Sequence, residues 1–488
     1  MQIPFGEWLP DQPEYLNPGA NTANNVYFAR QSYKRFPSLV AYSSNNIGAN
    51  SRGAGSFRDN SNNVFNFVAN NTDIFQLDGG TFTSRKSSLT GTDTDYFTFT
   101  QFGQFVVASN GKDAAQYYEM GTSTNFANLS TIGTSGTVPV FKVSGVVRDF
   151  FVTGNHTNNS NRIQWSGIND LTTWQPGTKQ SDLQDLPGSG GQITHITSGE
   201  IGYVFRQNQI IRMDYVGGAT VFRLSVISPN RGAVLGRTVC QDNRRVFFYA
   251  DDGFYELNGD QVISIGAEKV NRFFDTDLNK AFSDRICAAV DPFNQLALWL
   301  YPSASNTANT TGICDKVIIY NYATQKWSTA DASASTIFSQ FVGAYTVELM
   351  DIISENLDAI NIALDTDFWN GGQLYLGAID SDFKAAIFSG TENEGTLETR
   401  ELELFPGHRS SITNIRPIVD ATSTVTISSK ERLADTATES SSSSMVASGD
   451  NPVRQSGRYF KIKVTTPSGS VWTHAQGVDL IASRIGLR

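Results

Sequence analysis

The chain has 488 residues, 39% of them apolar and 17% charged, with a net charge of −10 and a pI near 5.0. Charged residues make up about 25% of an average globular domain; here Gly, Ser, Thr and Asn take their place, which favours short strands joined by many turns and argues against a helical protein. No run of Lys and Arg supplies the basic face that holds nucleic acid by its phosphates, so the composition leaves only loose passage of nucleic acid, or no contact with it.

The N-terminus, from Met1 to Trp8, has neither the basic region nor the apolar run of a signal peptide. No apolar run in the chain approaches the ~20 residues that span a bilayer. We therefore expect the protein to be made and assembled in a cytoplasm.

Residues 1–55 are expected to form an extended N-terminal arm. Prolines recur along it, and each removes a backbone donor and biases the preceding residue away from helix. The arm is nevertheless too apolar for a disordered tail, so its large side chains must cover a surface. Two alternatives stay open: the arm packs on its own domain, or it docks on a neighbouring subunit through the candidate interface residues Phe5, Trp8, Leu9, Tyr15 and Phe36.

Residues 56–345 alternate between short apolar strands and polar turns, including a hairpin with a turn at Asp251–Gly253. Radial repetition of small antiparallel sheets gives a β-propeller, and at about 40–45 residues per blade roughly 290 residues hold six or seven blades. One β-sandwich of this length would be oversized. The clearest strands are expected at 64–68, 73–77, 105–109, 149–153, 245–250, 254–257, 296–300 and 316–321.

Two short helices are expected in this all-β chain. From 267 to about 280, Val270, Phe273, Phe274 and Leu278 follow helical spacing and predict a connector between blades. The second helix is expected in the acidic stretch 347–357.

Residues 346–488 are expected to form a second, C-terminal β-domain that resembles a sandwich. Its strands are predicted at 374–377, 384–388, 397–404, 424–428, 458–464 and 471–481. A Ser/Thr-rich stretch that ends at Ser444 has few core-forming side chains and should be an exposed loop.

Cysteine and histidine offer little chemistry. Without a CxxC pair, the three cysteines are expected to be buried reduced thiols, and the four histidines lie in separate turns and strands without metal-ligand spacing. We expect neither a metal nor a cofactor. These residues are Cys240, Cys287, Cys314, His156, His195, His408 and His474.

Carboxylates are the remaining route to catalysis, because glycosidases commonly use a pair of them. The candidates near strand ends are Asp251, Asp252, Glu256 and Asp291, and a plain turn role is favoured for each. Residues 166–174 resemble the Asp-box of sialidase-type propellers with the Asp displaced, a motif that braces a blade turn. The chain is therefore not expected to be an enzyme, and a glycan-binding or glycan-cleaving propeller is the alternative.

Short segments spread over nearly the whole chain form an ordered set. They are Ile3–Asp11, Asn17–Ala20, Phe36–Leu39, Ile163–Ser166 with Thr173–Trp174, Asp251–Tyr255, Ile265–Val270, Asp291–Trp299, Arg416–Asp420, Gly457–Tyr459 and Trp472–Gly477. In order and spacing this set resembles the tail hub or nozzle proteins of short-tailed bacteriophages, which are similar to packaged-DNA stabilisation proteins.

The resemblance implies a structural subunit of a homohexameric ring in the virion tail, below the portal and its adaptor protein. Such a ring would extend the channel for double-stranded DNA, retain the packaged genome without reading its sequence, and carry fibres or spikes. This chain looks shorter than the larger nozzles, so insertions for a tip or for fibre docking are expected to be missing. A fibre or spike adhesin, which is normally trimeric, is a further alternative.

Overall fold

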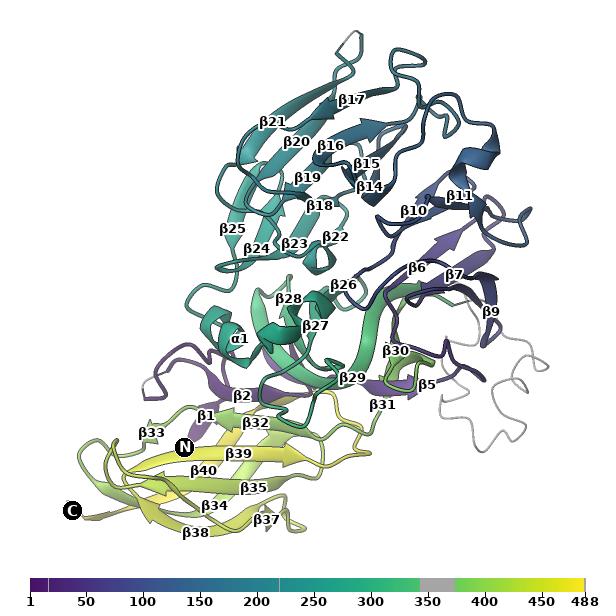
Figure 1. Cartoon of the computed structure of the whole chain (residues 1–488). Coiled ribbons are helices and arrows are strands. Elements are labelled where there is room, and N and C mark those ends of the chain that lie inside the picture. Colours follow the sequence, from purple (N-terminus) through teal and green to yellow (C-terminus); the bar gives the residue numbers. More distant parts are fainter. Residues whose placement is uncertain (16, 219, 343–373, 487–488) are drawn as a thin grey trace.

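The computed structural model describes residues 1–15, 17–218, 220–342 and 374–486 (Figure 1). Strands dominate these residues, which contain one α-helix, α1 (Asn271–Asp277), and the short 3-10 turns η1 (Leu129–Ile132), η2 (Gly236–Thr238) and η3 (Lys280–Arg285). Among them no helix is long and apolar enough to cross a membrane. The all-β prediction is confirmed.

Five four-stranded antiparallel sheets follow one another along the chain, each built from consecutive strands. Blades 1 to 5 are, in order, β6 (Gly53–Arg58), β7 (Val64–Ala69), β8 (Ile74–Asp78) and β9 (Thr81–Lys86); β10 (Thr98–Phe102), β11 (Phe105–Ser109), β12 (Gln116–Glu119) and β13 (Ala127–Asn128); β14 (Phe141–Val147), β15 (Phe150–His156), β16 (Asn159–Trp165) and β17 (Asp182–Asp185); β18 (Ile193–Ile196), β19 (Gly202–Arg206), β20 (Ile210–Tyr215) and β21 (Phe222–Ser228); β22 (Cys240–Asp242), β23 (Arg245–Ala250), β24 (Gly253–Asn258) and β25 (Gln261–Ser264).

Two more blades share one long strand. Blade 6 consists of β26 (Cys287–Asp291), β27 (Leu296–Tyr301), β28 (Cys314–Asn321) and the first half of β29 (Lys326–Phe341). The second half of β29 pairs with β30 (Leu374–Asp380), which pairs with β31 (Ala385–Gly390), whose other neighbour is β5 (Ser38–Ala41). This second group is blade 7, and the switch occurs at an irregularity between Ala334 and Thr336.

The ring closes because β29 packs beside β6 of blade 1. In the described part of the chain the propeller thus has seven blades, within the range that the sequence predicted, and its first strands face the axis. The outer strand of the last blade comes from the N-terminal arm. Closing the ring with a strand from the opposite end of the chain leaves no open edge between the last blade and the first.

Local sequence explains the hairpins. In blade 5, Ala250 pairs with Gly253, so Asp251 and Asp252 form a two-residue loop, as the turn prediction required. Gly253 has a φ of +140° and a Cβ there would collide with Asn271, so only glycine fits. The flanking strands, 245–250 and 253–258, are buried almost throughout, which suits strands that pack between neighbouring blades.

The second body is a β-sandwich that uses both ends of the chain (Figure 1). One sheet contains β1 (Gln2–Pro4), β3 (Val26–Ala29), β4 (Ser32–Arg35), β34 (Arg409–Val419), β38 (Asn451–Gly457) and β40 (Ala475–Gly486). The facing strands are β2 (Ala20–Asn24), β32 (Gly395–Thr399), β33 (Leu402–Glu403), β35 (Thr424–Lys430), β36 (Thr438–Glu439), β37 (Ser443–Ser444) and β39 (Tyr459–Thr466). Their apolar faces share one core, which continues into blades 5 and 6.

The domain boundaries differ from the sequence prediction. Strands β30 and β31 lie within the predicted C-terminal domain 346–488 but pair into blade 7, so the sandwich portion begins at β32. Residues 1–55 are not one extended arm, because they supply β1 to β5 and the start of β6 to the two bodies. The physical reason is long-range pairing, which carries no local sequence signal.

The smaller predictions vary in outcome. The connector helix is shorter than predicted: α1 covers 271–277, and η3 follows it. The predicted helix at 347–357 lies outside the described residues. The Ser/Thr-rich stretch is largely exposed, as predicted, although it adds the two-residue strands β36 and β37 at the sandwich edge.

Candidate functional site

The innermost strands of the propeller line an open central cavity of about 390 Å³. Its wall comes from β6, β10, β26 and β29, together with His195 of β18 and the segment 236–241 before and within β22. Aromatic rings of Phe57, Phe97 and Phe99 line one part, while Arg237 and Thr336 supply polar groups. A concave site of this size can hold a small ligand.

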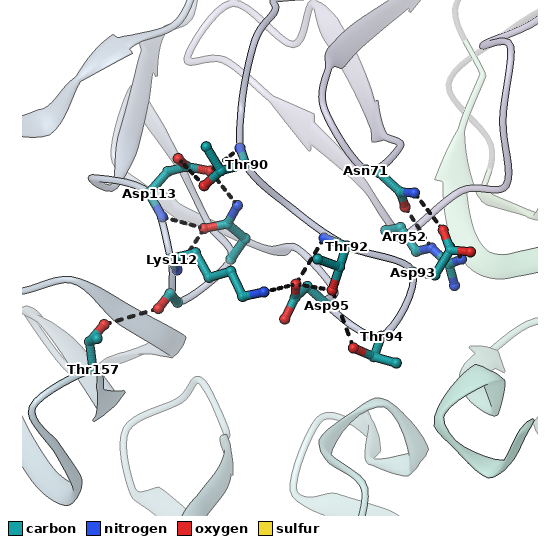
Figure 2. Close-up of polar contacts among 12 residues, drawn as sticks. Arg52, Asn71, Thr90, Thr92, Asp93, Thr94, Asp95, Lys112, Asp113 and Thr157 are labelled. Carbon is teal, nitrogen blue, oxygen red and sulfur yellow. Dashed lines mark hydrogen bonds and ion pairs between the residues drawn. The ribbon is translucent and has the colours of Figure 1, made fainter.

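The segment 87–97, which links blade 1 to blade 2, is fixed by polar contacts (Figure 2). The Asp95 carboxylate forms an ion pair with Lys112 at 2.7 Å and accepts a hydrogen bond from the Thr92 amide at 2.8 Å. The amide and hydroxyl of Thr90 each donate to Asp113 at 2.8 Å. Lys112 and Asp113 both lie in the turn after β11 of blade 2. These contacts therefore attach the linking segment to blade 2.

Asp93, on the same segment, contacts the residue that precedes β6. Its carboxylate lies 3.2 Å from an Arg52 guanidinium nitrogen, and the Asn71 side chain donates a hydrogen bond to it at 2.5 Å (Figure 2). The Asn71 hydrogen bond, with Arg52 and Arg285 nearby, lowers the pKa of Asp93 although burial opposes this. Asp93 is therefore ionised at neutral pH.

The five candidate interface residues of the arm all contact their own chain, which is the first of the two alternatives for the arm. Phe5, Trp8, Leu9 and Phe36 are buried, and Tyr15 is half-buried. The Trp8 ring packs edge-on against Phe273 of α1 at 5.0 Å, Phe36 packs on Phe388 of β31, and Tyr15 packs on Tyr459 of β39. Four of the five side chains therefore belong to the chain's own core, and Tyr15 keeps part of its surface exposed.

Several of the segments that carry the family resemblance meet at this arm. The Phe5 amide donates to the Gln476 carbonyl at 3.0 Å, and Pro4 pairs with Gly477. Lys269 forms an ion pair with Glu7 at 2.7 Å. A Cβ on Gly477 would collide with the arm backbone, so glycine is required where the two segments cross. We call the contacts among residues 3–11, 265–273 and 472–477 the arm seam.

The arm seam also caps α1. Both carboxylate oxygens of Asp11 accept hydrogen bonds from the first amides of the helix, those of Arg272 and Phe273, at 2.9 and 2.8 Å. A carboxylate at a helix start satisfies amides that lack a partner in the helix. The arm therefore joins the sandwich to the propeller through buried rings, an ion pair and a helix cap.

The carboxylates considered for catalysis do not converge. Asp252 accepts a hydrogen bond from the Tyr255 hydroxyl at 2.8 Å and pairs with Arg231 at 3.1 Å, while Glu256 is held by both ends of the Arg245 guanidinium at 2.7 and 2.9 Å. Asp291 closes its own turn by accepting from the Phe293 and Asn294 amides, and Asp251 is exposed in the hairpin loop. Each has the structural role that its turn or strand position favoured.

Asp170 of the Asp-box-like segment also braces a turn. Its carboxylate accepts hydrogen bonds from the Thr172 amide and hydroxyl and from the Thr173 hydroxyl, and it pairs with Lys179. Burial raises the pKa of Asp170, but these contacts outweigh burial and lower it strongly. Trp174, four residues after Asp170, is fully buried.

The histidines and cysteines lie apart. His156 is buried beside Thr153, and burial lowers its pKa to about 4; burial likewise lowers that of His195 to about 4. All three cysteines are buried and unpaired, and burial raises the pKa of their thiols. In the described ranges no group of three or more His, Cys, Asp or Glu side chains could hold a metal ion.

No family model and no curated protein matches this chain. Among solved structures, a chain in the crystal structure of the mitotic checkpoint complex is similar at 11% identity and a TM-score of 0.41, over 74% of this chain and 97% of that one. A chain in the crystal structure of BBS1N in complex with ARL6DN, soaked with mercury, is similar at 10% identity and a TM-score of 0.41, over 72% and 96%.

Sequence reasoning missed the charged residues around the central cavity. Arg52, Arg237 and Arg285 lie far apart in the chain and form no run, so no local pattern marks them. Only the order of the blades around the ring brings them together.

Proposed function

We propose that this chain is a structural subunit of a tail hub or nozzle ring of a short-tailed bacteriophage. In this proposal six copies surround the DNA path, retain the packaged genome and support fibres or spikes. The chain contributes shape and stiffness, and it does no covalent chemistry.

The observation that carries the proposal is the arm seam. Three of the segments that resemble the phage family are distant in sequence but meet where sandwich and propeller join, because segment 3–11 contacts both 265–270 and 472–477. The resemblance therefore falls on residues that set the relative placement of the two bodies. A subunit that must hold a fixed shape within a ring requires such a junction.

Charge supports the same proposal. The net charge of −10 disfavours tight binding to DNA phosphates, whose contacts with Lys and Arg supply most non-specific affinity. A channel wall that releases DNA during ejection needs weak contacts of this kind.

Native mass spectrometry of the full-length chain, alone and mixed with the portal–adaptor assembly of its own phage, tests the proposal. We expect six copies of this chain bound per adaptor ring. A trimer that ignores the adaptor would favour the adhesin alternative, and a monomer that cleaves oligosaccharides would favour the glycan-cleaving one. Either result would overturn the proposal.

A further inference from the structure

Arg237 lines the central cavity at one end, and Arg52 and Arg285, which meet at Asp93, add their charge nearby without lining the cavity themselves. Arg52 directly precedes β6, Arg237 lies in η2 just before β22, and Arg285 ends η3 just before β26. These are the innermost strands of blades 1, 5 and 6, and because every blade repeats the same strand order from the axis outward, they run in the same direction. Residues that precede them therefore lie at the same end of the cavity.

The carboxylates near these three arginines are fewer than the arginines themselves. Asp93 pairs with Arg52 at 3.2 Å, both labelled in Figure 2, and it also lies 3.9 Å from Arg285. Asp284 lies 3.4 Å from the Arg285 Nε, yet this buried nitrogen has no hydrogen-bond partner. Within the part of the chain that the structure describes, no carboxylate lies within ion-pair distance of Arg237.

Arg237 is the arginine that reaches the cavity itself. It is half-buried, and one of its guanidinium nitrogens donates a hydrogen bond to the Thr336 hydroxyl at 3.0 Å. A guanidinium carries five N–H donors, so most of its donors remain free to bind a ligand. A half-buried guanidinium with free donors can hold an anion through charge-assisted hydrogen bonds.

The field of the cluster is positive although the whole chain is acidic. Burial first, and then the charges of Arg285 and Arg237, lower the pKa of Arg52 to about 10 despite the opposing effect of Asp93. An anion bound among the three would reverse this mutual repulsion. Phosphate oxygens fit the planar fork of arginine in a two-point contact.

We propose that this end of the central cavity binds a small phosphate-type oxyanion, held directly by Arg237, with Arg52 and Arg285 adding positive charge behind it. Inorganic phosphate and the phosphomonoester of a nucleotide share this chemistry. The cavity volume of about 390 Å³ admits either, and the aromatic rings on its wall could cover a base. The inference stands independently of the tail assignment.

Isothermal titration of the full-length chain with inorganic phosphate, and separately with adenosine monophosphate, tests it at constant ionic strength set with chloride. The wild type is expected to bind phosphate, and Arg237→Gln to bind it roughly tenfold more weakly or worse. The matched control is Arg223→Gln, which removes an exposed arginine of β21 that pairs with Asp214. It should leave affinity unchanged.

Each result of these titrations either supports or overturns the oxyanion site. Tighter binding of adenosine monophosphate than of phosphate assigns a nucleotide, and equal binding assigns the free anion; both support the oxyanion site. Three results would overturn the oxyanion site. They are no phosphate binding above that seen with chloride alone, an equal loss of phosphate affinity in Arg223→Gln, and binding of duplex DNA without binding of free phosphate. If Arg237→Gln does not fold, Arg237→Lys keeps the charge but loses the fork, and unchanged affinity in that variant would equally overturn it.

Discussion

The propeller and the sandwich are built from similar strands but by opposite routes. Blades 1 to 5 each use consecutive strands joined by short turns, so most of their pairing is local. The sandwich pairs the first strand with the last, with Gln2 opposite Asp479, and inserts β2 between β32 and β29. Local pairing costs little loop-closure entropy, whereas pairing of the two chain ends costs more.

This difference shows that the N-terminal arm is what connects the propeller rigidly to the sandwich. It supplies β1 to β4 to the sandwich and β5 to the last blade, so damage to the arm should affect the junction while blades 1 to 5 keep their own hairpins.

The largest effect is expected from Trp8→Ala. Trp8 is 3% exposed, packs against Phe273 and donates its indole N–H to the Asn21 carbonyl at 3.1 Å. Removing it should lower the free energy of unfolding by about 3–5 kcal/mol through lost burial and a cavity. Denaturant melts would show an early transition that reports the sandwich and the arm seam.

Phe293→Ala is the control for Trp8→Ala. Phe293 sits in a turn of blade 6 and is 85% exposed, so its loss should change stability by less than about 0.5 kcal/mol. Equal destabilisation by both variants would contradict the role of the arm seam.

A slightly smaller loss is expected from Glu401→Gln in the sandwich. Glu401 pairs with Lys430 at 2.7 Å, and the two side chains are 4% and 12% exposed. Breaking a buried pair leaves one charge without a partner and should cost about 3 kcal/mol. Urea melts of the full-length chain measure this loss.

The exposed pair between Lys463 and Glu439, at 2.9 Å, gives the matched comparison. Glu439→Gln should cost less than about 1 kcal/mol, because solvent screens exposed pairs. If both glutamate variants melt alike, burial does not set the strength of these pairs.

In the propeller, His156 should make stability sensitive to acid. Its folded pKa is lowered to about 4 by burial and by Arg162, against an ordinary value of 6.5. As pH falls from 6.5 to 4 the unfolded chain takes up a proton that the folded chain excludes, so unfolding becomes easier through that window. His156→Gln should flatten this part of the stability profile.

The wild-type chain is the reference for the pH series, with its denaturation midpoints measured from pH 7 to pH 4 beside those of His156→Gln. An unchanged slope in His156→Gln would show that the acid sensitivity arises elsewhere.

The smallest effect is expected from Asp11→Ala, which removes the cap of α1 and should cost about 1 kcal/mol. Asp11→Asn keeps an acceptor and should cost less. Thermal melts of the two variants, side by side, separate the cap from other effects of the arm; identical losses would argue against the cap.

Local patterns in the sequence predicted many of the strands correctly. Val64–Val68, Arg245–Ala250 and Leu296–Leu300 were predicted as strands and form β7, β23 and β27, because alternation and turn residues act within a few positions. The division of β29 between two blades and the use of β5 as the outer strand of blade 7 could not be predicted. Both depend on partners that lie far away in the chain.

The candidate site was harder to predict than the fold. Asp252 and Glu256 were visible as carboxylates near strand ends, and their turn and ion-pair roles followed from the hairpin. The cluster of Arg52, Arg237 and Arg285 was not visible, because their separation along the chain hides a proximity that only ring closure creates.

The number of copies in the assembled tail tests the central claim most directly. Cryo-electron microscopy of purified virions should show this propeller and sandwich, joined at the arm seam as one rigid unit, repeated six times around the DNA path. Density for three copies at the tip of a fibre, or no density for the chain in the virion, would contradict the account.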